Sequence, residues 1–288
     1  MFTKLSLIRY MYTQMNIVQN EGGAYYKPLF YEYPNDDAAY DNQELNIMLG
    51  PSLKLGIQSK SMSVESQFYY PAGRYCEVFC KREKNCCYTY ETGQEVTLPT
   101  LAFNYYLDLR AGHIIPMQNA TRIASLDHDV QKNITTHSMQ DEPFEMHIMP
   151  MLNVDDKKFE ATGRYFNDDG ITLDKEDSHT CDFGYDHNIT DGASPDTMEI
   201  NVFCTGVNRT INGNDKLGAI QIYDATNMGV ALNTYDVSVT QVGPDGTDVT
   251  KKIGQTTYRT QDDRLSWIPN IGVSLDEIRD ISTITFTK

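Results

Sequence analysis

The chain has 288 residues, of which 40% are hydrophobic, so it can bury two or three cores in one large domain or in several small ones. Its 40 acidic residues outnumber its 24 basic residues and give a net charge of -16. Such a charge repels phosphate backbones and anionic headgroups, which argues against nucleic acid as a partner. Because no apolar run approaches the roughly 18 residues that cross a bilayer, we expect no membrane span.

The first 50 residues contain a helical pattern followed by an extended one. Apolar side chains recur at intervals of three and four and predict an amphipathic helix that stops at the glycine pair 22–23: Leu5, Ile8, Met11, Tyr12, Met15 and Val18. Residues 25–33 are aromatic and β-prone, as expected of a buried strand. The aspartate pair 36–37 can cap a short helix that runs to about Leu45.

Beyond residue 50 the apolar residues alternate with polar ones, which predicts antiparallel sheets with one buried face. The expected strands lie around residues 62–64, 68–70, 95–98, 105–109, 144–148, 200–202, 220–222, 237–239, 265–267 and 281–285. The polar segment from about residue 120 to 142 is the best candidate for a boundary between two β-modules.

The six cysteines form one close group and one distant pair: Cys76, Cys80, Cys86 and Cys87, then Cys181 and Cys204. Four close thiols are able to bind zinc, but two of them are adjacent in the sequence, unlike the paired spacing of structural zinc sites. We therefore favour disulfides, with two bridges in the hairpin of residues 76–87 and one between Cys181 and Cys204. Sequence alone permits 15 pairings of six cysteines.

Four N-glycosylation sequons accompany these cysteines, at Asn119, Asn133, Asn188 and Asn208. Together the two features predict the secretory pathway, with an extracellular or lysosome-like destination. The first 20 residues lack the apolar region of a signal peptide, because Arg9, Gln14 and Asn16 interrupt it. We therefore expect the chain to begin partway through its precursor.

Other patterns give little support for a metal or cofactor site. The segment Asp168-Asp169-Gly170 resembles a calcium loop, but it would place Tyr165 at the first ligand position of an EF-hand. A hairpin turn is the simpler interpretation. The six histidines lack paired metal-ligand spacing, and the sequence contains no phosphate-binding glycine loop or dinucleotide fingerprint. We predict no metal and no cofactor.

Five segments, taken in order, resemble motifs of the α-glucosidases of glycoside hydrolase family 31. They are residues 9–12 with 27–34, similar to an "RY" helix and an "RPLFFEFP" strand; 41–53, similar to "D-x-Q-x-M-x-G-x-S-L"; 70–75, similar to "YFP-x-G-x-W"; 109–116, similar to "L-RAG-x-IIP"; and 166–170, similar to "FWDDG". The resemblance covers roughly residues 5 to 175. It implies a mainly β fold, in which the end of a (β/α)8 barrel is followed by two antiparallel β-sandwich modules.

The resemblance also implies a division into three parts. Residues 1–50 would be the C-terminal remnant of the barrel, 51–135 a proximal β-sandwich and 136–288 a distal β-sandwich. The apolar stripe of the first helix, together with Leu29, Phe30 and Tyr31, would then lie against barrel elements that this chain does not encode.

Function follows from what the family motifs leave out. In the family, the nucleophilic and acid/base aspartates precede the "RY" helix, so we assign no catalytic residue here and expect the chain alone to be inactive. The resemblance implies a C-terminal supporting region of an α-glucosidase-like hydrolase, whose partner is the N-terminal catalytic portion of the same precursor or other copies in an assembly. The alternative is a non-catalytic extracellular protein, structural or glycan-contacting, derived from such an enzyme.

Departures from the motifs favour the alternative. The arginine of "RPLFFEFP" is Lys27, the tryptophan of "FWDDG" is Asn167, and an apolar strand has become residues 54–58, with Lys, Gly and Gln. A buried strand that acquires these residues loses apolar packing. Carbohydrate is a possible ligand, since the 19 tyrosines offer aromatic faces, although tyrosine is also an ordinary strand residue.

Overall fold

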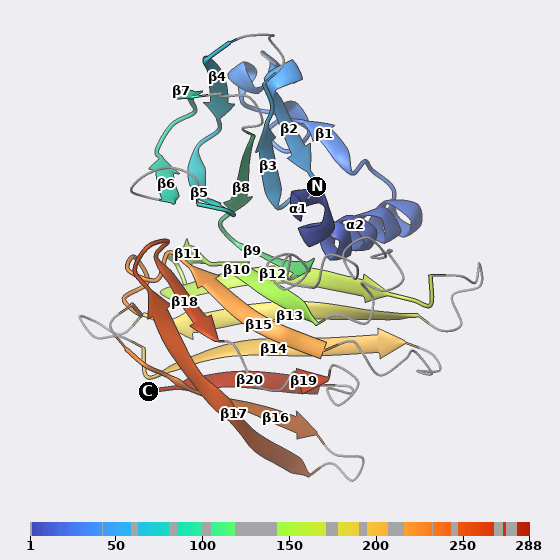
Figure 1. Ribbon diagram of the computed structural model, residues 1–288, viewed down its shortest axis with the longest axis vertical. Helices are drawn as coiled ribbons and strands as arrows, with labels where there is room; N and C mark the ends of the chain where they lie inside the picture. The colour runs from blue at the N-terminus through green and yellow to red at the C-terminus, as the bar shows by residue number, and fades with distance from the viewer. Residues whose placement is uncertain are drawn as a thin grey trace, which may run out of the picture. The chain divides into compact units, whose positions relative to one another are not determined.

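The computed structural model of the chain describes residues 2–41, 43–58, 63–80, 86–99, 105–118, 143–170, 178–189, 195–206, 216–231, 233–242, 247–267, 273–274 and 281–288. The described residues are mainly β-structure with few helices, as the sequence predicts. They divide into two compact units (Figure 1). The smaller unit contains residues 17–113, and the larger unit contains residues 1–16 and 114–288.

Two consecutive helices begin the chain, α1 (Phe2–Ser6) and α2 (Ile8–Glu21). They cover the stretch where the apolar periodicity predicts a helix. Gly22 and Gly23 follow with φ angles of 85° and 92°, the left-handed region that glycine enters without steric cost. The predicted stop of the helix at this glycine pair is therefore confirmed.

The smaller unit is built on a six-stranded sheet and a two-stranded ribbon. The sheet has the order β1 (Tyr26–Pro28), β2 (Asn46–Leu49), β3 (Leu53–Gly56), β8 (Tyr106–Arg110), β5 (Gly73–Glu77), β6 (Cys87–Tyr90), and the ribbon pairs β4 (Glu65–Tyr70) with β7 (Gln94–Pro99). Short 3₁₀ helices lie between β1 and β2: η1 (Leu29–Tyr31), η2 (Asp37–Tyr40) and η3 (Gln43–Leu45). Aromatic side chains dominate one core cluster of this unit, among them Phe68, Tyr70, Tyr75, Tyr90 and Tyr106.

The larger unit contains a twelve-stranded sheet. Its strands are β9 (His113–Gln118), β10 (Phe144–Met149), β11 (Met151–Asn153), β12 (Lys158–Asn167), β13 (His179–Asn188), β14 (Thr197–Gly206), β15 (Lys216–Tyr223), β16 (Asp236–Val242), β17 (Asp248–Arg259), β18 (Arg264–Trp267), β19 (Val273–Ser274) and β20 (Ile281–Thr287). The hydrogen-bonded order is β10-β9-β12-β13-β14-β20-β16-β17-β18-β15-β19. Figure 1 shows β12, β13, β14 and β20 lying side by side.

A parallel pairing between β10 and β15 closes this sheet into a ring of strands. The prediction of a purely antiparallel sandwich was wrong at this seam, where Phe144 to Ile148 pair with Leu217 to Ile222 in parallel. No local sequence pattern predicts this parallel pairing, because the two strands are far apart in the sequence. Inside the ring lies the main core, which includes Trp267, Tyr165 and Tyr235.

The predicted strand of residues 25–33 is shorter in the structure. Only Tyr26–Pro28 pairs, with β2, and the chain then turns into η1, where the amides of Glu32 and Tyr33 bond to the carbonyl of Leu29. A parallel barrel strand needs a partner on each side, and among the described residues β1 has β2 alone. The (β/α)8 barrel is therefore not seen in this segment.

The compact units also divide the chain differently from the three predicted parts. Residues 1–16 group with the later strands, while 17–50 group with the proximal strands. The second segment of the larger unit begins at residue 114, because β9 joins the large sheet between β10 and β12. The predicted boundary segment, from residue 120 to 142, lies outside the described residues.

The polar residues of β3 are packed rather than exposed. Lys54 is fully buried, and its ammonium group donates to the Asn46 amide oxygen at 3.0 Å and lies 3.9 Å from the centre of the Tyr70 ring. A hydrogen bond and a cation–π contact both offset the loss of hydration of a buried lysine. Gly56 lies under the Phe68 ring, which an added Cβ would approach at 3.0 Å. This strand has exchanged apolar packing for specific polar packing.

We predict that Gly163→Ala destabilises the larger unit. Gly163 lies in β12, and a Cβ there would collide with the backbone oxygen of Ile114. Overpacking of this kind costs about 1–3 kcal/mol. Urea unfolding measures the change.

Gly184→Ala is the matched control, because a Cβ at Gly184 in β13 meets nothing within 4 Å. Alanine should stabilise that strand position by about 0.5–1 kcal/mol. Equal destabilisation by the two substitutions would contradict the close approach of β12 and β9.

Candidate functional site

A buried arginine of α2 connects two of the family-like motifs within the larger unit. Arg9 Nε donates to Gln118 Oε1 at 2.9 Å, and Nη1 donates to Tyr165 OH at 3.0 Å and to Asn167 Oδ1 at 3.3 Å. We call these residues, together with Thr13, the Arg9 cluster. The two halves of the cluster, one near residue 9 and one near residue 166, are separated by more than 150 positions in the sequence, and the fold brings them together.

Thr13 and Tyr12 extend the contact between α2 and the end of β12. The Thr13 hydroxyl donates to the Arg9 carbonyl at 2.8 Å and accepts from the Phe166 amide at 3.1 Å. The Tyr12 hydroxyl lies 2.7 and 2.6 Å from the two carboxylate oxygens of Asp168. Partial burial and the Asp168 carboxylate raise the pKa of Tyr12, so the phenol stays protonated and donates.

Asp168 therefore has a structural role in the described residues. Besides Tyr12 it accepts from the amide of Gly170 at 2.9 Å, and Gly170 has a φ of 64°. This is the geometry of a tight turn, in keeping with the turn interpretation of the Asp-Asp-Gly segment. Within the described ranges, no group of three or more His, Cys, Asp or Glu side chains is placed to hold a metal ion.

A second motif cluster lies in the smaller unit around Glu32. Lys27 Nζ is 2.8 Å from Glu32 Oε1, and Arg110 Nη1 is 3.4 Å from Glu32 Oε2. The Arg110 guanidinium also donates to the Pro51 carbonyl at 2.6 Å and lies 4.9 Å from the centre of the Tyr33 ring. Lys27, one of the departures from the family motif, thus pairs with a glutamate of the same motif.

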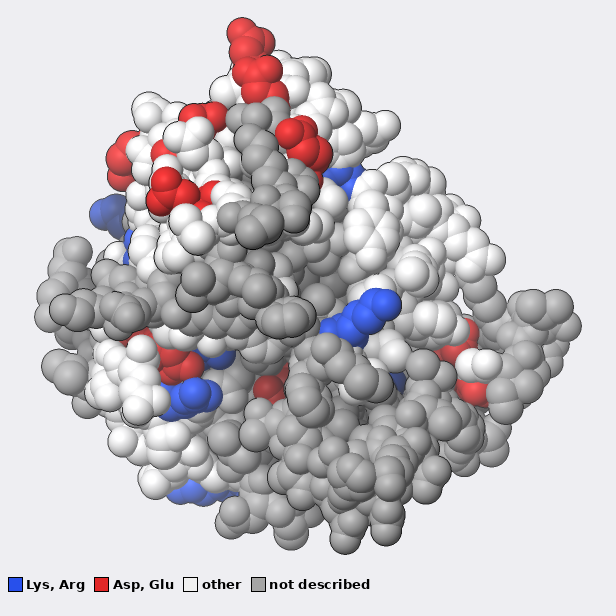
Figure 2. Space-filling model, turned by 45° about the horizontal axis from the view of Figure 1, so that its top comes forward, with Lys and Arg blue, Asp and Glu red and all other residues white. Residues whose placement is uncertain are grey.

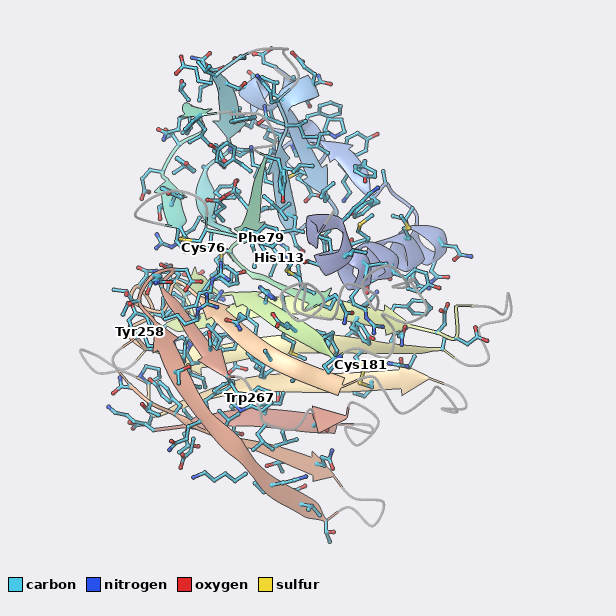
Figure 3. The ribbon with its side chains drawn as sticks, in the orientation of Figure 1. Cys76, Phe79, His113, Cys181, Tyr258 and Trp267 are labelled. Carbon is cyan, nitrogen blue, oxygen red and sulfur yellow. A yellow bond between two sulfur atoms is a disulfide. The ribbon has the colours of Figure 1, made fainter. Side chains whose placement is uncertain are left out.

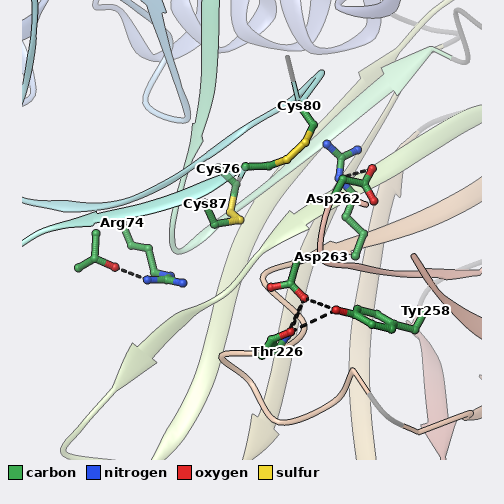
Figure 4. The surroundings of a disulfide bond; sticks show 11 residues. Arg74, Cys76, Cys80, Cys87, Thr226, Tyr258, Asp262 and Asp263 are labelled. Carbon is green, nitrogen blue, oxygen red and sulfur yellow. Dashed lines mark hydrogen bonds and ion pairs between the residues drawn. A yellow bond between two sulfur atoms is a disulfide. The ribbon is translucent and has the colours of Figure 1, made fainter. Parts of the chain in front are cut away.

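All six cysteines are joined in disulfides. Cys76–Cys87 and Cys80–Cys86 lie at the hairpin of β5 and β6, and Cys181–Cys204 joins β13 to β14 (Figures 3 and 4). Cys76 faces Cys87, and Cys181 faces Cys204, as directly opposed residues of neighbouring strands. Each of these two bridges has a Cα–Cα distance of 4.0 Å, so each pins two adjacent strands.

A tyrosine, a histidine and a glutamate form a chain of hydrogen bonds in the larger unit. His147 Nδ1 lies 2.7 Å from Tyr223 OH, and Nε2 lies 3.1 Å from Glu145 Oε2. Burial lowers the pKa of His147 and raises that of Tyr223 to about 12. The order resembles a catalytic relay, but the Tyr223 side chain is fully buried under the Arg264 guanidinium, 4.0 Å from its ring centre. A substrate cannot reach the Tyr223 hydroxyl, so we assign a structural role to these three hydrogen-bonded side chains.

A nearby turn is held by one aspartate. Asp263 Oδ1 accepts from the amide of Thr226 at 2.9 Å, from its hydroxyl at 2.7 Å and from the hydroxyl of Tyr258 at 3.0 Å (Figure 4). Asp263 itself has a φ of 50°. These bonds fix the connection between β17 and β18 and leave little capacity on this oxygen for chemistry.

The predicted glycosylation sites are mostly outside the described residues. Asn119, Asn133 and Asn208 fall there, while Asn188 is the exposed last residue of β13. On the face drawn in Figure 2, acidic side chains are spread among uncharged ones, and the described residues form no continuous basic surface. No helix in the described part of the chain is long and apolar enough to cross a membrane.

Comparison with known proteins agrees with the motif order. The chain is 25% identical over 172 residues to human probable maltase-glucoamylase 2 and 29% identical over 172 residues to the α-glucosidase of Hordeum vulgare. These alignments cover 60% and 58% of the chain. Over about 60% of its length, the chain is similar to family 31 α-glucosidases. No family model matches it.

Solved structures of this family share its fold. A GH31 dextranase of Flavobacterium johnsoniae matches 99% of the chain with a TM-score of 0.67 and 18% identity, and a complex of endoplasmic reticulum glucosidase II matches 99% with a TM-score of 0.70 and 15% identity. The chain spans only 32% and 28% of those two chains, and 6% and 17% of the human and barley relatives. The relatives are therefore several times longer.

The two motif clusters do not resemble a glycosidase centre. A general acid of this class needs a carboxyl group in an apolar surrounding that raises its pKa. Glu32 instead faces two cations, and Asp168 accepts from a phenol and an amide. The family-like residues described here hold the fold together.

We predict that the larger unit loses stability in acid, in part through His187. Its ring stacks on Phe159 with centroids 5.0 Å apart, and Nδ1 lies 2.8 Å from Tyr185 OH. Burial lowers the pKa of His187 to about 4. The unfolded histidine takes up a proton near pH 6.5, before the folded one does, so stability falls from pH 6.5 toward pH 4 and is unaffected above that range.

The share of His187 in this loss is about 2 kcal/mol between pH 7 and pH 5. Urea unfolding of wild-type protein and of His187→Gln at both pH values measures it. The variant should be less stable at pH 7 but should lose less on acidification. The same loss in both proteins would show that His187 does not carry the effect.

Proposed function

We propose that the chain is the C-terminal supporting region of an α-glucosidase-like glycoside hydrolase. The observation that carries the proposal is the Arg9 cluster, where two family-like motifs far apart in the sequence meet through a buried guanidinium. A buried cation is costly unless it is fully hydrogen-bonded, so this contact has to be specified by the sequence. The similarity to longer α-glucosidases supports the same proposal.

The exposed side of helix α2 supports the proposal of a neighbouring portion. The buried residues of this helix are Arg9, Tyr10, Thr13 and Gln14, which are mostly polar, whereas Met15 is 49% exposed. A surface helix ordinarily buries its apolar side. In our proposal the outward apolar side of α2 receives a preceding barrel portion, of which residues 1–50 are the end.

Residues 26–31 in the smaller unit bear on the same proposal. Leu29 is buried in the core of the smaller unit itself, contrary to the expectation for this residue, whereas Tyr31 is 61% exposed and Tyr26 is 59% exposed. Full burial of a large apolar side chain contributes about 1.5–3 kcal/mol to stability, and an exposed one does not make this contribution. A barrel neighbour would recover part of this free energy.

Catalysis then belongs to the preceding portion. Retaining glycosidases use two carboxyl groups about 5 Å apart, one as nucleophile and one as acid/base. In the complete protein the preceding portion supplies this pair and the sugar pocket, and the present chain supplies support. By resemblance, the substrates are α-linked glucosides. A partner chain or further copies of this chain are the other candidates for the missing neighbour.

We predict that the purified chain releases no glucose from maltose and no chromophore from an aryl α-glucoside. We expect this result because the proposal places both catalytic carboxyl groups in the preceding portion of the complete protein. A full-length α-glucosidase serves as the positive control under the same conditions. Turnover that persists in a verified single-chain preparation would refute the proposal.

The alternative is a non-catalytic extracellular protein, structural or glycan-contacting. Its support in the sequence is the drift at Lys27, Asn167 and residues 54–58, together with the added cysteines. The drifted residues, however, make specific contacts with Glu32, Arg9, Asn46 and Tyr70. Packing of this kind weakens the argument for relaxed constraints. Translation of the genomic sequence upstream of Met1 distinguishes the two: a barrel with both aspartates favours the enzyme, and a barrel without them favours the alternative.

We place the protein in the secretory pathway, on the basis of the paired cysteines and the four sequons. We predict that at least two of Asn119, Asn133, Asn188 and Asn208 carry glycans. Intact-mass measurement before and after enzymatic deglycosylation tests this, with Asn188→Gln as a single-site control. An unchanged mass in the native protein would remove the basis for this compartment.

A further inference from the structure

The middle of β13 contains a glycine that the fold does not require. Gly184 pairs with Thr162 on one side and Asn201 on the other, and a Cβ there would meet nothing within 4 Å. Its φ lies outside the left-handed region that favours glycine. Glycine weakens a strand interior and often marks a place where a ligand approaches the backbone.

An exposed aromatic ring, that of Phe203, lies on the same face of the sheet, diagonally across from Gly184 on the neighbouring strand. Phe203 in β14 is 49% exposed and lies directly across from Asp182, while Asn201 lies directly across from Gly184. Residues two apart on a strand point to the same face, about 7 Å apart, and directly opposed residues lie about 5 Å apart. The four positions thus frame a patch of the size of one sugar ring, with its floor at Gly184.

Polar groups surround this patch. Arg164 Nε donates to Asp182 Oδ1 at 2.7 Å, and both side chains are partly exposed. The Thr283 hydroxyl donates to Asn201 Oδ1 at 2.9 Å, which fixes the amide and directs its nitrogen to other acceptors. Carboxylate, guanidinium and amide groups are suitable partners for the hydroxyl groups of a sugar.

The patch is held rigidly from behind. The Cys181–Cys204 bridge joins the two strands one residue away from the Asp182–Phe203 pair, and its cysteines are buried on the inner face (Figure 3 labels Cys181). A site that is already in its bound geometry loses less entropy when a ligand binds.

We propose that this outer face of β13 and β14 binds a neutral oligosaccharide, with one pyranose ring stacked on Phe203 above Gly184. The apolar face of a sugar ring packs on an aromatic face, and its hydroxyls meet Asp182, Arg164 and Asn201. Asp186 and Glu199 occupy directly opposed positions on β13 and β14, next to the patch. Their negative charges disfavour anionic ligands there. The proposal goes beyond the supporting role, because it assigns ligand binding to the chain itself.

Calorimetric titration of the purified chain with maltoheptaose tests the site. Wild-type protein should bind the sugar saturably, and Phe203→Ala and Gly184→Val should each weaken binding at least tenfold. Valine favours strands and has open space at position 184, so Gly184→Val should unfold at the same temperature as wild type or above it. Thr240→Ala is the matched control on the same face, across Thr283 from Asn201, and should bind as wild type does.

Three outcomes would overturn the proposal. They are no saturable binding of maltoheptaose, binding that is equal in wild type, Phe203→Ala and Gly184→Val, and binding that Thr240→Ala weakens as much as they do. Self-association that Phe203→Ala abolishes, without sugar binding, would instead assign the face to a second copy of the chain. None of these results bears on the upstream catalytic portion, so failure here would leave the supporting role untouched.

Discussion

The buried guanidinium of Arg9 determines how the start of the chain is packed. A guanidinium removed from water needs hydrogen-bond partners in a planar arrangement, and Gln118, Tyr165 and Asn167 provide them from β9 and β12. This requirement turns the polar side of α2 toward its own sheet. As a direct consequence, Met15 points outward. The apolar surface that we assign to a missing neighbour is thus created by a polar contact.

The strands were predictable because their signal is local. Alternation of apolar and polar residues around 200–202, 237–239 and 281–285 reflects one buried face, and β14, β16 and β20 lie there. The end of α2 was predictable for a similar reason, because Gly22 and Gly23 terminate the helix locally, within one turn. The disulfide-bonded hairpin of residues 76–87 was predictable from the close spacing of its four cysteines.

Long-range features were not predictable in this way. The parallel seam between β10 and β15 joins strands about 70 residues apart, and each strand alone looks like any buried strand. Lys54 looked like a loss of packing, because its partners Asn46 and Tyr70 are identified only by the fold. The patch at Gly184 and Phe203 is not recognisable from the sequence for the same reason, since only the strand register places the two residues on one face.

The central claim is that Arg9 anchors helix α2 to the large sheet of the same chain. Hydrogen exchange measured by mass spectrometry on a demonstrated monomer tests it, with wild type compared with Arg9→Ala. We expect slow exchange at residues 9–16 in wild type, fast exchange there in the variant, and slow exchange in β13 and β14 of both. Met15→Ala, at a position that is 49% exposed, should match wild type. Unchanged protection of residues 9–16 in Arg9→Ala would contradict the account.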